Sequence, residues 1–204
     1  MIYVAGTGSF AADVAEIAQD AGFDVAGLIE LHDPARVGTQ IHGFEVVALG
    51  PPPDPEATSI VGAGGDRVAI CDQLEGAGWR FATVIHPRAH VPRSAQLGPG
   101  TLAGPGAILG AAVRTGRHAV LGRGCTIGHH TVLGDFVTIN PGVHVAGNAA
   151  LGEGAFVGIG AAIRDHVRVG ARALVAAGAV VVADVPAGAE VRGVPARPVE
   201  RAAP

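Results

Sequence analysis

Apolar and small residues recur with a period of six over the second half of the chain. Residues 91 to 180 divide into fifteen hexads without an insertion, and thirteen of the fifteen first positions are Val, Leu or Ile. The second position is glycine ten times, and the fifth is always Ala, Val, Thr or Cys. This period matches neither the 3.6-residue repeat of a helix nor the two-residue alternation of a strand. It predicts a solenoid in which each hexad forms a short strand and a turn.

Each position of the hexad has an expected role in such a solenoid. The aliphatic first residue points inward and stacks on its equivalent in the next coil, and the small fifth residue lets a narrow interior close. Glycine at the second position suits a corner that needs backbone freedom or a close approach. A disordered Gly/Ala-rich tract would not keep this phase over the whole segment.

The first part of the chain has a different pattern, typical of a small α/β domain. Residues 2–5 predict a buried strand, residues 10–21 an amphipathic helix with Ser9 as its N-cap, and residues 24–30 a second strand. Together they form a βαβ unit with a glycine-rich first turn and an acidic residue, Glu30, at the end of the second strand. Helix N-termini of this kind bind phosphate through free N–H groups and the helix dipole.

The remaining segments complete the predicted organisation. Residues 51–55 are rich in proline and indicate a loop. A strand over 59–61, a helix over 66–76 and a strand over 81–85 follow, and His86-Pro87 starts the first coil. We therefore predict a Rossmann-like domain over 1–84, a parallel β-helix over 85–183 and a C-terminal tail over 184–204.

Composition excludes several classes of protein. The net charge is −4 and all 14 basic residues are arginine, which disfavours a nucleic-acid binder. No apolar run is long enough to span a membrane and the first residues do not form a signal peptide. The two cysteines, Cys71 and Cys125, lie far apart and fit thiols in a reducing cytoplasm.

The hexad pattern resembles the bacterial hexapeptide-repeat acyltransferases. In that family three hexads make one triangular left-handed coil, so residues 18 apart stack, and the proteins are homotrimers with active sites between subunits. The α/β domain, the Ile85-His86-Pro87 junction and the closing Gly193-Val194-Pro195 are similar to nucleotide-sugar N-acetyltransferases and sialic-acid O-acetyltransferase-like proteins. This resemblance implies acetyl-CoA as the co-substrate and an amino or hydroxyl group of a sugar as the acceptor.

The same resemblance indicates the residues that carry the chemistry. Acyl transfer needs a base for the acceptor's proton and donors for the developing oxyanion. His129 stands where the subfamily has its catalytic histidine, and Gly147, 18 residues later, stands where it has an oxyanion-binding amide. For acetyl-CoA the resemblance implies Gly147, Ile159 and Ala177, with Arg197 near a CoA phosphate.

For the sugar or nucleotide sugar, the resemblance implies a set of residues in the glycine-rich turns of the first domain and one in the β-helix: Gly6, Thr7, Gly8, Ser9, Phe10, Glu30, Gly62, Arg67 and Thr138. Each of the main assignments has a purely structural alternative. Glu30 could be a strand-end charge, Gly147 a corner glycine, and His129 an exposed histidine at a turn.

Three positions depart from the subfamily. The acidic residue that follows its catalytic histidine is His130 here, so another acceptor, such as a backbone carbonyl, has to orient the ring. Asp165, two coils further on, is a distant candidate. A further active-site histidine is replaced by Thr138, and a Gly-His-Gly-Lys turn by residues 9–12, Ser-Phe-Ala-Ala.

Two other functions compete with acetyl transfer. A γ-class carbonic anhydrase shares the β-helix but needs three histidines around zinc, two of them typically five apart, and the helix holds no such pair. We expect no metal. A non-catalytic trimeric scaffold is the second alternative, in which His129 is incidental.

Overall fold

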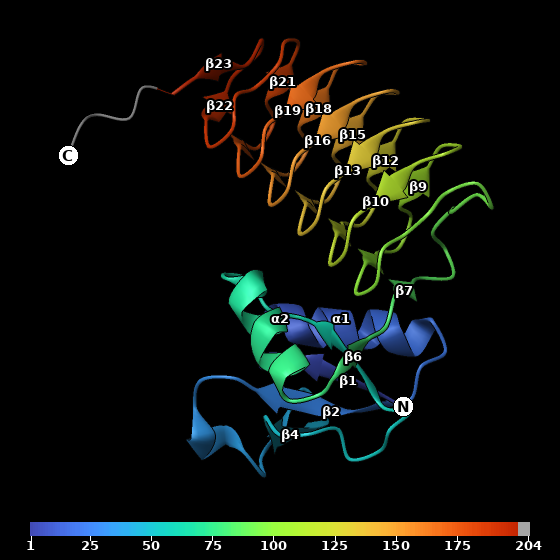
Figure 1. Ribbon diagram of the computed structural model, residues 1–204, viewed down its shortest axis with the longest axis vertical. Helices are drawn as coiled ribbons and strands as arrows, with labels where there is room; N and C mark the ends of the chain where they lie inside the picture. The colour runs from blue at the N-terminus through green and yellow to red at the C-terminus, as the bar shows by residue number, and fades with distance from the viewer. Residues whose placement is uncertain (200–204) are drawn as a thin grey trace. The chain divides into compact units, whose positions relative to one another are not determined.

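A computed structural model describes residues 1–199, which form two compact units. The first spans Met1–Pro87 and the second begins at Arg88. The first unit is a mostly parallel sheet with helices, and the second is a stack of coils (Figure 1).

The first unit has the expected βαβ core. Its sheet has the strand order β3-β4-β2-β1-β5-β6, and every neighbouring pair except β3 and β4 is parallel. Its elements are β1 (Ile2–Ala5), α1 (Ser9–Asp20), β2 (Val25–Glu30), the 3₁₀ turn η1 (Pro34–Arg36), β3 (Gln40–Ile41), β4 (Phe44–Ala48), β5 (Thr58–Val61), α2 (Arg67–Gly76), β6 (Arg80–Phe81) and β7 (Val84–Ile85).

Three details differ from the sequence prediction. The hairpin β3–β4, at one edge of the sheet, was not predicted because its strands are short and only Val46 is fully buried. The strand expected over 81–85 is two short strands, β6 and β7. The N-cap of α1 is Gly8 rather than Ser9, and no side chain caps this helix, because Ser9 is already its first helical residue.

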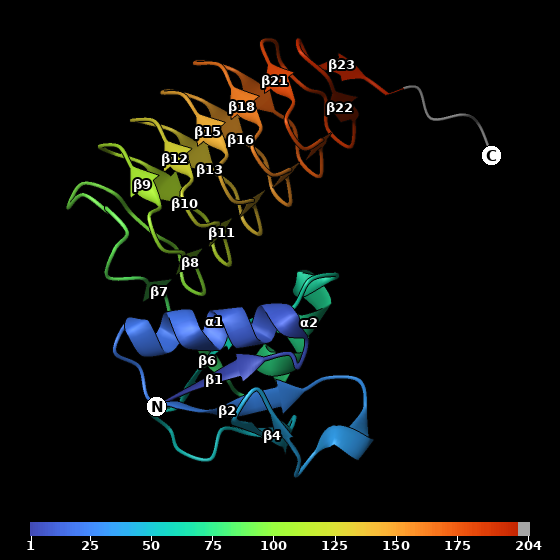
Figure 2. The ribbon, with the colours of Figure 1, turned by 180° about the vertical axis from the view of Figure 1, so that it is seen from behind.

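The second unit is a triangular parallel β-helix built from three sheets. Partner residues are 18 apart, as Val120 and Thr138 show, so three hexads make one coil. One sheet contains β10 (Arg114–Thr115), β13 (Val132–Leu133), β16 (Ala150–Leu151) and β19 (Arg168–Val169). The next contains β9 (Ile108–Leu109), β12 (Thr126–Ile127), β15 (His144–Val145), β18 (Ala162–Ile163) and β21 (Val180–Val181), visible in Figure 2.

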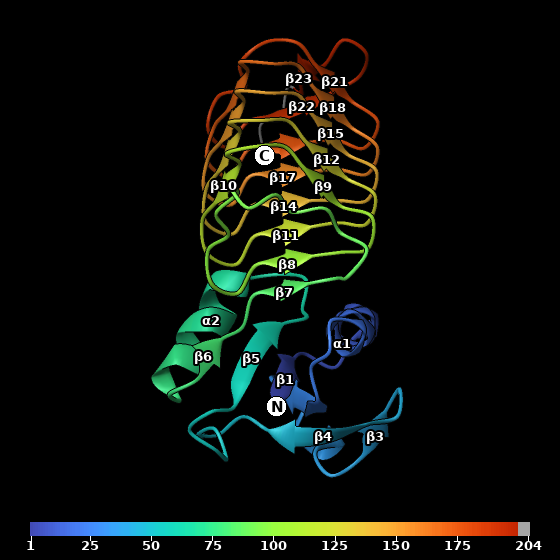
Figure 3. The same cartoon turned by 90° about the vertical axis from the view of Figure 1, so that its right-hand side faces the viewer.

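The strands of the third sheet of the helix form the central column in Figure 3. It contains β8 (Leu102–Ala103), β11 (Val120–Leu121), β14 (Thr138–Ile139), β17 (Phe156–Val157), β20 (Leu174–Val175), β22 (Glu190–Arg192) and β23 (Arg197–Pro198). Beyond Val181 the repeat shortens, since Leu174 pairs with Glu190, only 16 residues later.

The interior of the helix confirms the roles assigned to the first and fifth positions. From Leu109 to Val175 the first-position side chains are at most 9% exposed, and the fifth-position residues between them are buried as well. Stacked aliphatic side chains therefore form one continuous core along the helix axis, and burial of this apolar surface stabilises every coil.

Glycine at the second position serves close approach rather than backbone freedom. A Cβ at Gly152 would lie 2.6 Å from the backbone nitrogen of Ala171, and one at Gly134 would lie 2.7 Å from that of Glu153. The left-handed backbone instead falls on the fourth position, which holds His130 with φ 58° and Asn148 with φ 58°. Conformations of this kind suit Gly, Asn, Asp and His better than other residues.

Candidate active site

His129 lies at a corner of the β-helix, at the turn between β12 and β13. Its side chain is exposed, and its backbone carbonyl accepts the N–H of Asn148 on the next coil at 2.8 Å. The coil on the other side is equally close, because a Cβ at Gly110 would lie 2.6 Å from the backbone nitrogen of His129. The ladder of coils therefore holds the backbone of His129 while its imidazole projects from the corner.

The imidazole of His129 covers Gly147. A Cβ at Gly147 would lie 2.8 Å from Cε1 and 2.9 Å from Nε2 of that ring. The carbonyl of Gly147 accepts the N–H of His166 at 3.2 Å, whereas its own N–H has no hydrogen-bond acceptor within residues 1–199. The imidazole of His129 therefore lies over a residue that has no side chain.

His130 contacts His129, contrary to the expectation that a backbone carbonyl orients the ring. The two Nδ1 atoms are 3.1 Å apart and the ring planes are 83° from parallel. Asp165 does not reach His129, because its carboxylate bonds to Nδ1 of His166 at 2.8 Å. That hydrogen bond is the main reason that the pKa of Asp165 lies below its usual value.

Thr138 is not beside His129 within one chain. His129 lies at the corner between the β12 and β13 sheets, whereas Thr138 lies on β14, in the sheet opposite that corner, between Val120 and Phe156. Ile159 and Ala177 stack at another corner, where Ile159 is 61% exposed. Arg197 is exposed, and its guanidinium donates to the carbonyl of Ala196 at 2.9 Å. One chain thus spreads these residues over several surfaces.

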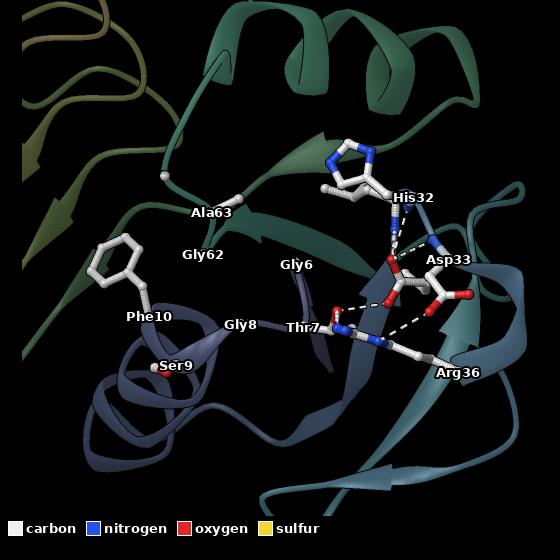
Figure 4. A pocket seen from close by; sticks show the side chains of 13 residues that line it. Gly6, Thr7, Gly8, Ser9, Phe10, His32, Asp33, Arg36, Gly62 and Ala63 are labelled. Carbon is white, nitrogen blue, oxygen red and sulfur yellow. Dashed lines mark hydrogen bonds and ion pairs between the residues drawn. The ribbon is translucent and has the colours of Figure 1, made fainter.

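A pocket of about 490 Å³ lies at the carboxyl ends of the central strands of the first unit (Figure 4). This volume is typical of small-molecule sites. Phe10 and His32 flank it from opposite sides. It brings together every first-unit residue proposed for the substrate except Arg67; its lining is Gly6, Thr7, Gly8, Ser9, Phe10, Glu30, Leu31, His32, Asp33, Arg36, Gly62, Ala63 and Gly64.

Glu30 organises one wall of this pocket. Its Oε1 accepts the backbone N–H groups of Leu31, His32 and Asp33 at 2.8–3.0 Å, and its Oε2 accepts the hydroxyl of Thr7 at 2.6 Å. Burial acts to raise the pKa of Glu30, but these hydrogen bonds outweigh it and hold the pKa at about 2. Both oxygens are occupied, so Glu30 shapes the loop after β2 rather than presenting a free carboxylate.

This hydrogen bonding predicts an acid-sensitive first unit. The pKa of Glu30 is lower in the folded protein than in the unfolded chain, so the ionised carboxylate adds to the free energy of unfolding above the unfolded pKa. This contribution is lost as the pH falls toward about 2. We expect Glu30→Gln to flatten the pH dependence of unfolding between about pH 4.5 and 2. Urea unfolding followed by the fluorescence of Trp79, the single tryptophan, measures it.

Glu45→Gln, at an exposed carboxylate on β4, is the matched control and should keep the wild-type dependence. An unchanged slope in Glu30→Gln would show that the carboxylate contributes nothing to the folded state.

The cation of the pocket is Arg36, which sequence analysis missed in favour of Arg67. Nη1 of Arg36 donates to the hydroxyl of Thr7 at 3.2 Å, and its Nε lies 3.4 Å from Asp33 (Figure 4). Arg67 starts α2 and does not line the pocket, and burial lowers its pKa. The Asp33-Pro34 turn signal that places Arg36 is present in the sequence, but only the fold brings it to Thr7.

Other chemistry is not supported by the described residues. Burial raises the pKa of the Cys125 thiol to about 12, so this cysteine is not a thiolate nucleophile near neutral pH. Within residues 1–199, no three His, Cys, Asp or Glu side chains are grouped so that they could hold a metal ion. The same residues include no helix that is long and apolar enough to cross a membrane.

Neither a family model nor a curated protein sequence matches this chain. Solved structures do. The acetyltransferase domain of PglB from Neisseria gonorrhoeae FA1090 is 31% identical with a TM-score of 0.87, and the match covers 97% of this chain and 98% of that one. The chain belongs to this acetyltransferase family.

Two further solved structures match over nearly their whole length. Perosamine N-acetyltransferase from Caulobacter crescentus, solved with CoA and GDP-perosamine, is 29% identical with a TM-score of 0.89, covering 98% of this chain and 97% of that one. WeeI from Acinetobacter baumannii AYE is 26% identical with a TM-score of 0.87, covering 98% and 99%. The PglB domain has also been solved with acetyl coenzyme A. These matches confirm the left-handed β-helix fold, and the protein is an acyltransferase.

Proposed function

We propose that this acetyltransferase transfers the acetyl group of acetyl-CoA to an amino group of a nucleotide-linked sugar, with a sugar hydroxyl as the alternative acceptor. The observation that supports it most directly is the imidazole of His129 lying over Gly147, whose N–H has no acceptor in the described chain. A base and an oxyanion donor are thereby adjacent on one corner. CoA and GDP-perosamine in the solved relatives support the same pair of substrates.

In the proposed reaction, Nε2 of His129 takes the proton of the acceptor amine as its nitrogen attacks the thioester carbonyl. The N–H of Gly147 stabilises the negative charge that develops on the carbonyl oxygen. The carbon–sulfur bond then breaks, the proton held by His129 passes to the CoA sulfur, and the products are an amide and free CoA. The acceptor amine must be uncharged to attack, so the rate rises with pH.

The acceptor's nucleotide is proposed to bind in the pocket of the first unit, Met1–Pro87, and acyl transfer to take place on the β-helix of the second unit. The uncapped N-terminus of α1 favours anionic groups. Arg36 adds a guanidinium that suits a phosphate oxygen. The Ser-Phe-Ala-Ala turn at residues 9–12 offers few polar side chains, so backbone groups and Arg36 carry the recognition.

Arg36→Gln tests the phosphate role. We expect KM for the nucleotide sugar to rise roughly tenfold with little change in kcat, because a charged hydrogen bond contributes ~1.5–3 kcal/mol in a partly wet site. Steady-state kinetics with the acceptor varied measures the effect. Arg80→Gln, at an exposed arginine that does not line the pocket, should leave KM unchanged. An unchanged KM in Arg36→Gln would place the phosphates elsewhere.

The active form is proposed to be a homotrimer. Thr138 and His129 lie on opposite sides of one chain, so they serve one site only if two chains supply them. Ile159 and Ala177 would likewise reach CoA from a corner next to a neighbouring subunit, and Arg197 from β23. Phe156 is 43% exposed on the same face as Thr138, and a subunit contact would cover it.

Sedimentation equilibrium at micromolar concentration should therefore give three times the mass of the 20.3 kDa chain. Phe156→Glu should lower this mass and the activity together, because it places a charge on the proposed contact face. A fully active monomer would show that every catalytic group comes from one chain.

The function itself is tested by incubation with acetyl-CoA and a panel of GDP-, UDP- and dTDP-linked amino sugars. Free thiol release and an acetyl-group gain in product mass are the measurements. The expected result is turnover of at least one nucleotide-linked amino sugar. Tight binding of acetyl-CoA and nucleotides without turnover would favour the scaffold function, and cytoplasmic location stays a prediction.

A further inference from the structure

His129 and His130 are adjacent in sequence, and the corner makes their rings meet edge to face. His130 has a left-handed backbone with φ 58°, which places its ring against the side of the His129 ring. The Nδ1 atoms are 3.1 Å apart, a hydrogen-bond distance for two nitrogens. One Nδ1 must therefore carry a hydrogen and the other a lone pair.

The direction of this hydrogen bond decides whether His129 can act as a base. A neutral imidazole carries a single hydrogen, so Nε2 of His129 has a free lone pair only when its hydrogen is on Nδ1. That hydrogen then needs an acceptor, and Nδ1 of His130 is in place to accept it. If the bond is reversed, His129 carries its hydrogen on Nε2 and cannot take a proton there.

We propose that His130 is the positioning residue of the catalytic base, and that the two histidines form a pair whose proton count switches the enzyme; this inference rests on the proposed function. In the active state Nδ1–H of His129 donates to Nδ1 of His130, and Nε2 of His129 is free beside Gly147. His130 takes the role of the subfamily's acidic residue without its charge.

A single added proton inactivates the pair, whichever ring holds it. On Nε2 of His129 it makes an imidazolium with no lone pair. On Nδ1 of His130 it reverses the shared bond, so that Nδ1 of His129 accepts and the remaining hydrogen of His129 moves to Nε2. The active state therefore requires that neither ring carries an added proton, and the activity depends on both residues together.

Few ionisable groups surround this pair. The corner residues of the coils directly before and after it are neutral: Ala111, Ala112, Gly147 and Asn148. Of the ionisable residues further along the same corner, Asp165 is bonded to His166, and Arg93 lies two coils before His129 by the 18-residue spacing. On the flanking strands His144 is bonded to Thr126 at 2.8 Å, Val132 is apolar, and the exposed Arg114 on β10 is the ladder partner of Val132. The partner of His129 is thus an imidazole rather than a carboxylate.

The structure provides suitable substitutions at His130. The fourth position accepts asparagine at Asn148 with φ 58° and glycine at Gly124 with φ 66°, so His130→Asn, His130→Asp and His130→Gly suit its backbone. Asn and Asp place a side-chain oxygen as many bonds from Cα as the Nδ1 that it replaces. His130→Gly removes the acceptor altogether.

Rate–pH profiles of these variants separate positioning from a structural role. We expect His130→Asn to keep kcat within about threefold of wild type and His130→Gly to lose roughly tenfold or more, as supporting hydrogen bonds of this kind do. In His130→Asp the fall of kcat on the acid side of the rate–pH profile should move to higher pH by roughly 0.5–1 unit, because the carboxylate stabilises the His129 imidazolium. His166→Asn, at the same hexad position two coils on with φ 60°, should leave the profile unmoved.

A direct measurement of the tautomer completes the test without depending on turnover. Nitrogen-15 NMR of labelled protein at neutral pH should show His129 with its hydrogen on Nδ1, and His130→Gly should return it to the Nε2–H form that free imidazole side chains prefer. Nε2–H as the main form in wild type overturns the inference. So does a kcat in His130→Gly equal to wild type together with an unshifted His130→Asp profile.

These outcomes are distinct from failure of the proposed function. Absence of acetyl transfer by wild type on every acceptor would remove the reaction while the NMR measurement still decides the tautomer. Turnover that depends on His129 but is indifferent to all three His130 variants would keep the function and reject the pair.

Discussion

His129→Ala should lower kcat by ~10²–10⁴-fold, the usual contribution of a positioned general base. The backbone of His129 is held by the coils on both sides, and alanine suits the third position, as Ala111 at the same corner shows. The loss should therefore reflect the missing imidazole rather than a damaged fold. Steady-state kinetics and calorimetric binding of acetyl-CoA measure the two effects, and acetyl-CoA affinity should change little.

His144→Ala is the matched control for this substitution. His144 is an exposed histidine on the next coil, on β15, where its Nδ1 contacts Thr126 rather than Gly147. Its removal should leave kcat within about twofold of wild type. Equal losses in both variants would point to a general effect on the helix, and full activity of His129→Ala would assign catalysis to positioning alone.

Gly147→Ala should lower kcat by roughly 10²–10³-fold, similar to the loss of an oxyanion donor. The new methyl group would lie 2.8–2.9 Å from Cε1 and Nε2 of His129, closer than van der Waals contact, so the imidazole has to move. It would also fill the space beside the Gly147 N–H. The backbone φ of Gly147 is not left-handed, so alanine adds no backbone strain. Rate measurements at saturating substrate test this prediction.

A double-variant cycle identifies the cause of that loss. The new methyl group of Gly147→Ala has no imidazole to clash with when residue 129 is alanine. In the His129→Ala background, Gly147→Ala should therefore lower kcat by a much smaller factor than it does alone. Asp165→Ala changes the third position of the following coil at the same corner. It should leave kcat nearly unchanged, because Asp165 bonds to His166. Additive losses in the double variant would show that Gly147 acts independently of the His129 ring.

The first unit shows where local sequence signals succeed and fail. The strand–turn–helix signal of residues 2–20 and the helix over 66–76 are local and were predicted, whereas the N-cap of that second helix, Asp66, which accepts the N–H of Ala69 at 3.1 Å, was not. The hairpin β3–β4 carries little apolar alternation. Arg36 was missed as the pocket cation because its role depends on Thr7, 29 residues earlier in the chain.

The sequence pattern by itself determined the solenoid, and the family resemblance added the three-hexad coil that stacks Gly147 on His129. Each hexad buries its first and fifth positions, and coils of 18 residues without an insertion place residues 18 apart next to each other. Only the tertiary structure decided that second-position glycines serve close approach, that Glu30 uses both its oxygens on Thr7 and three backbone N–H groups, and that His130 contacts His129. These features depend on a backbone angle and on side-chain directions at single residues, and a repeating pattern of apolar positions does not encode them.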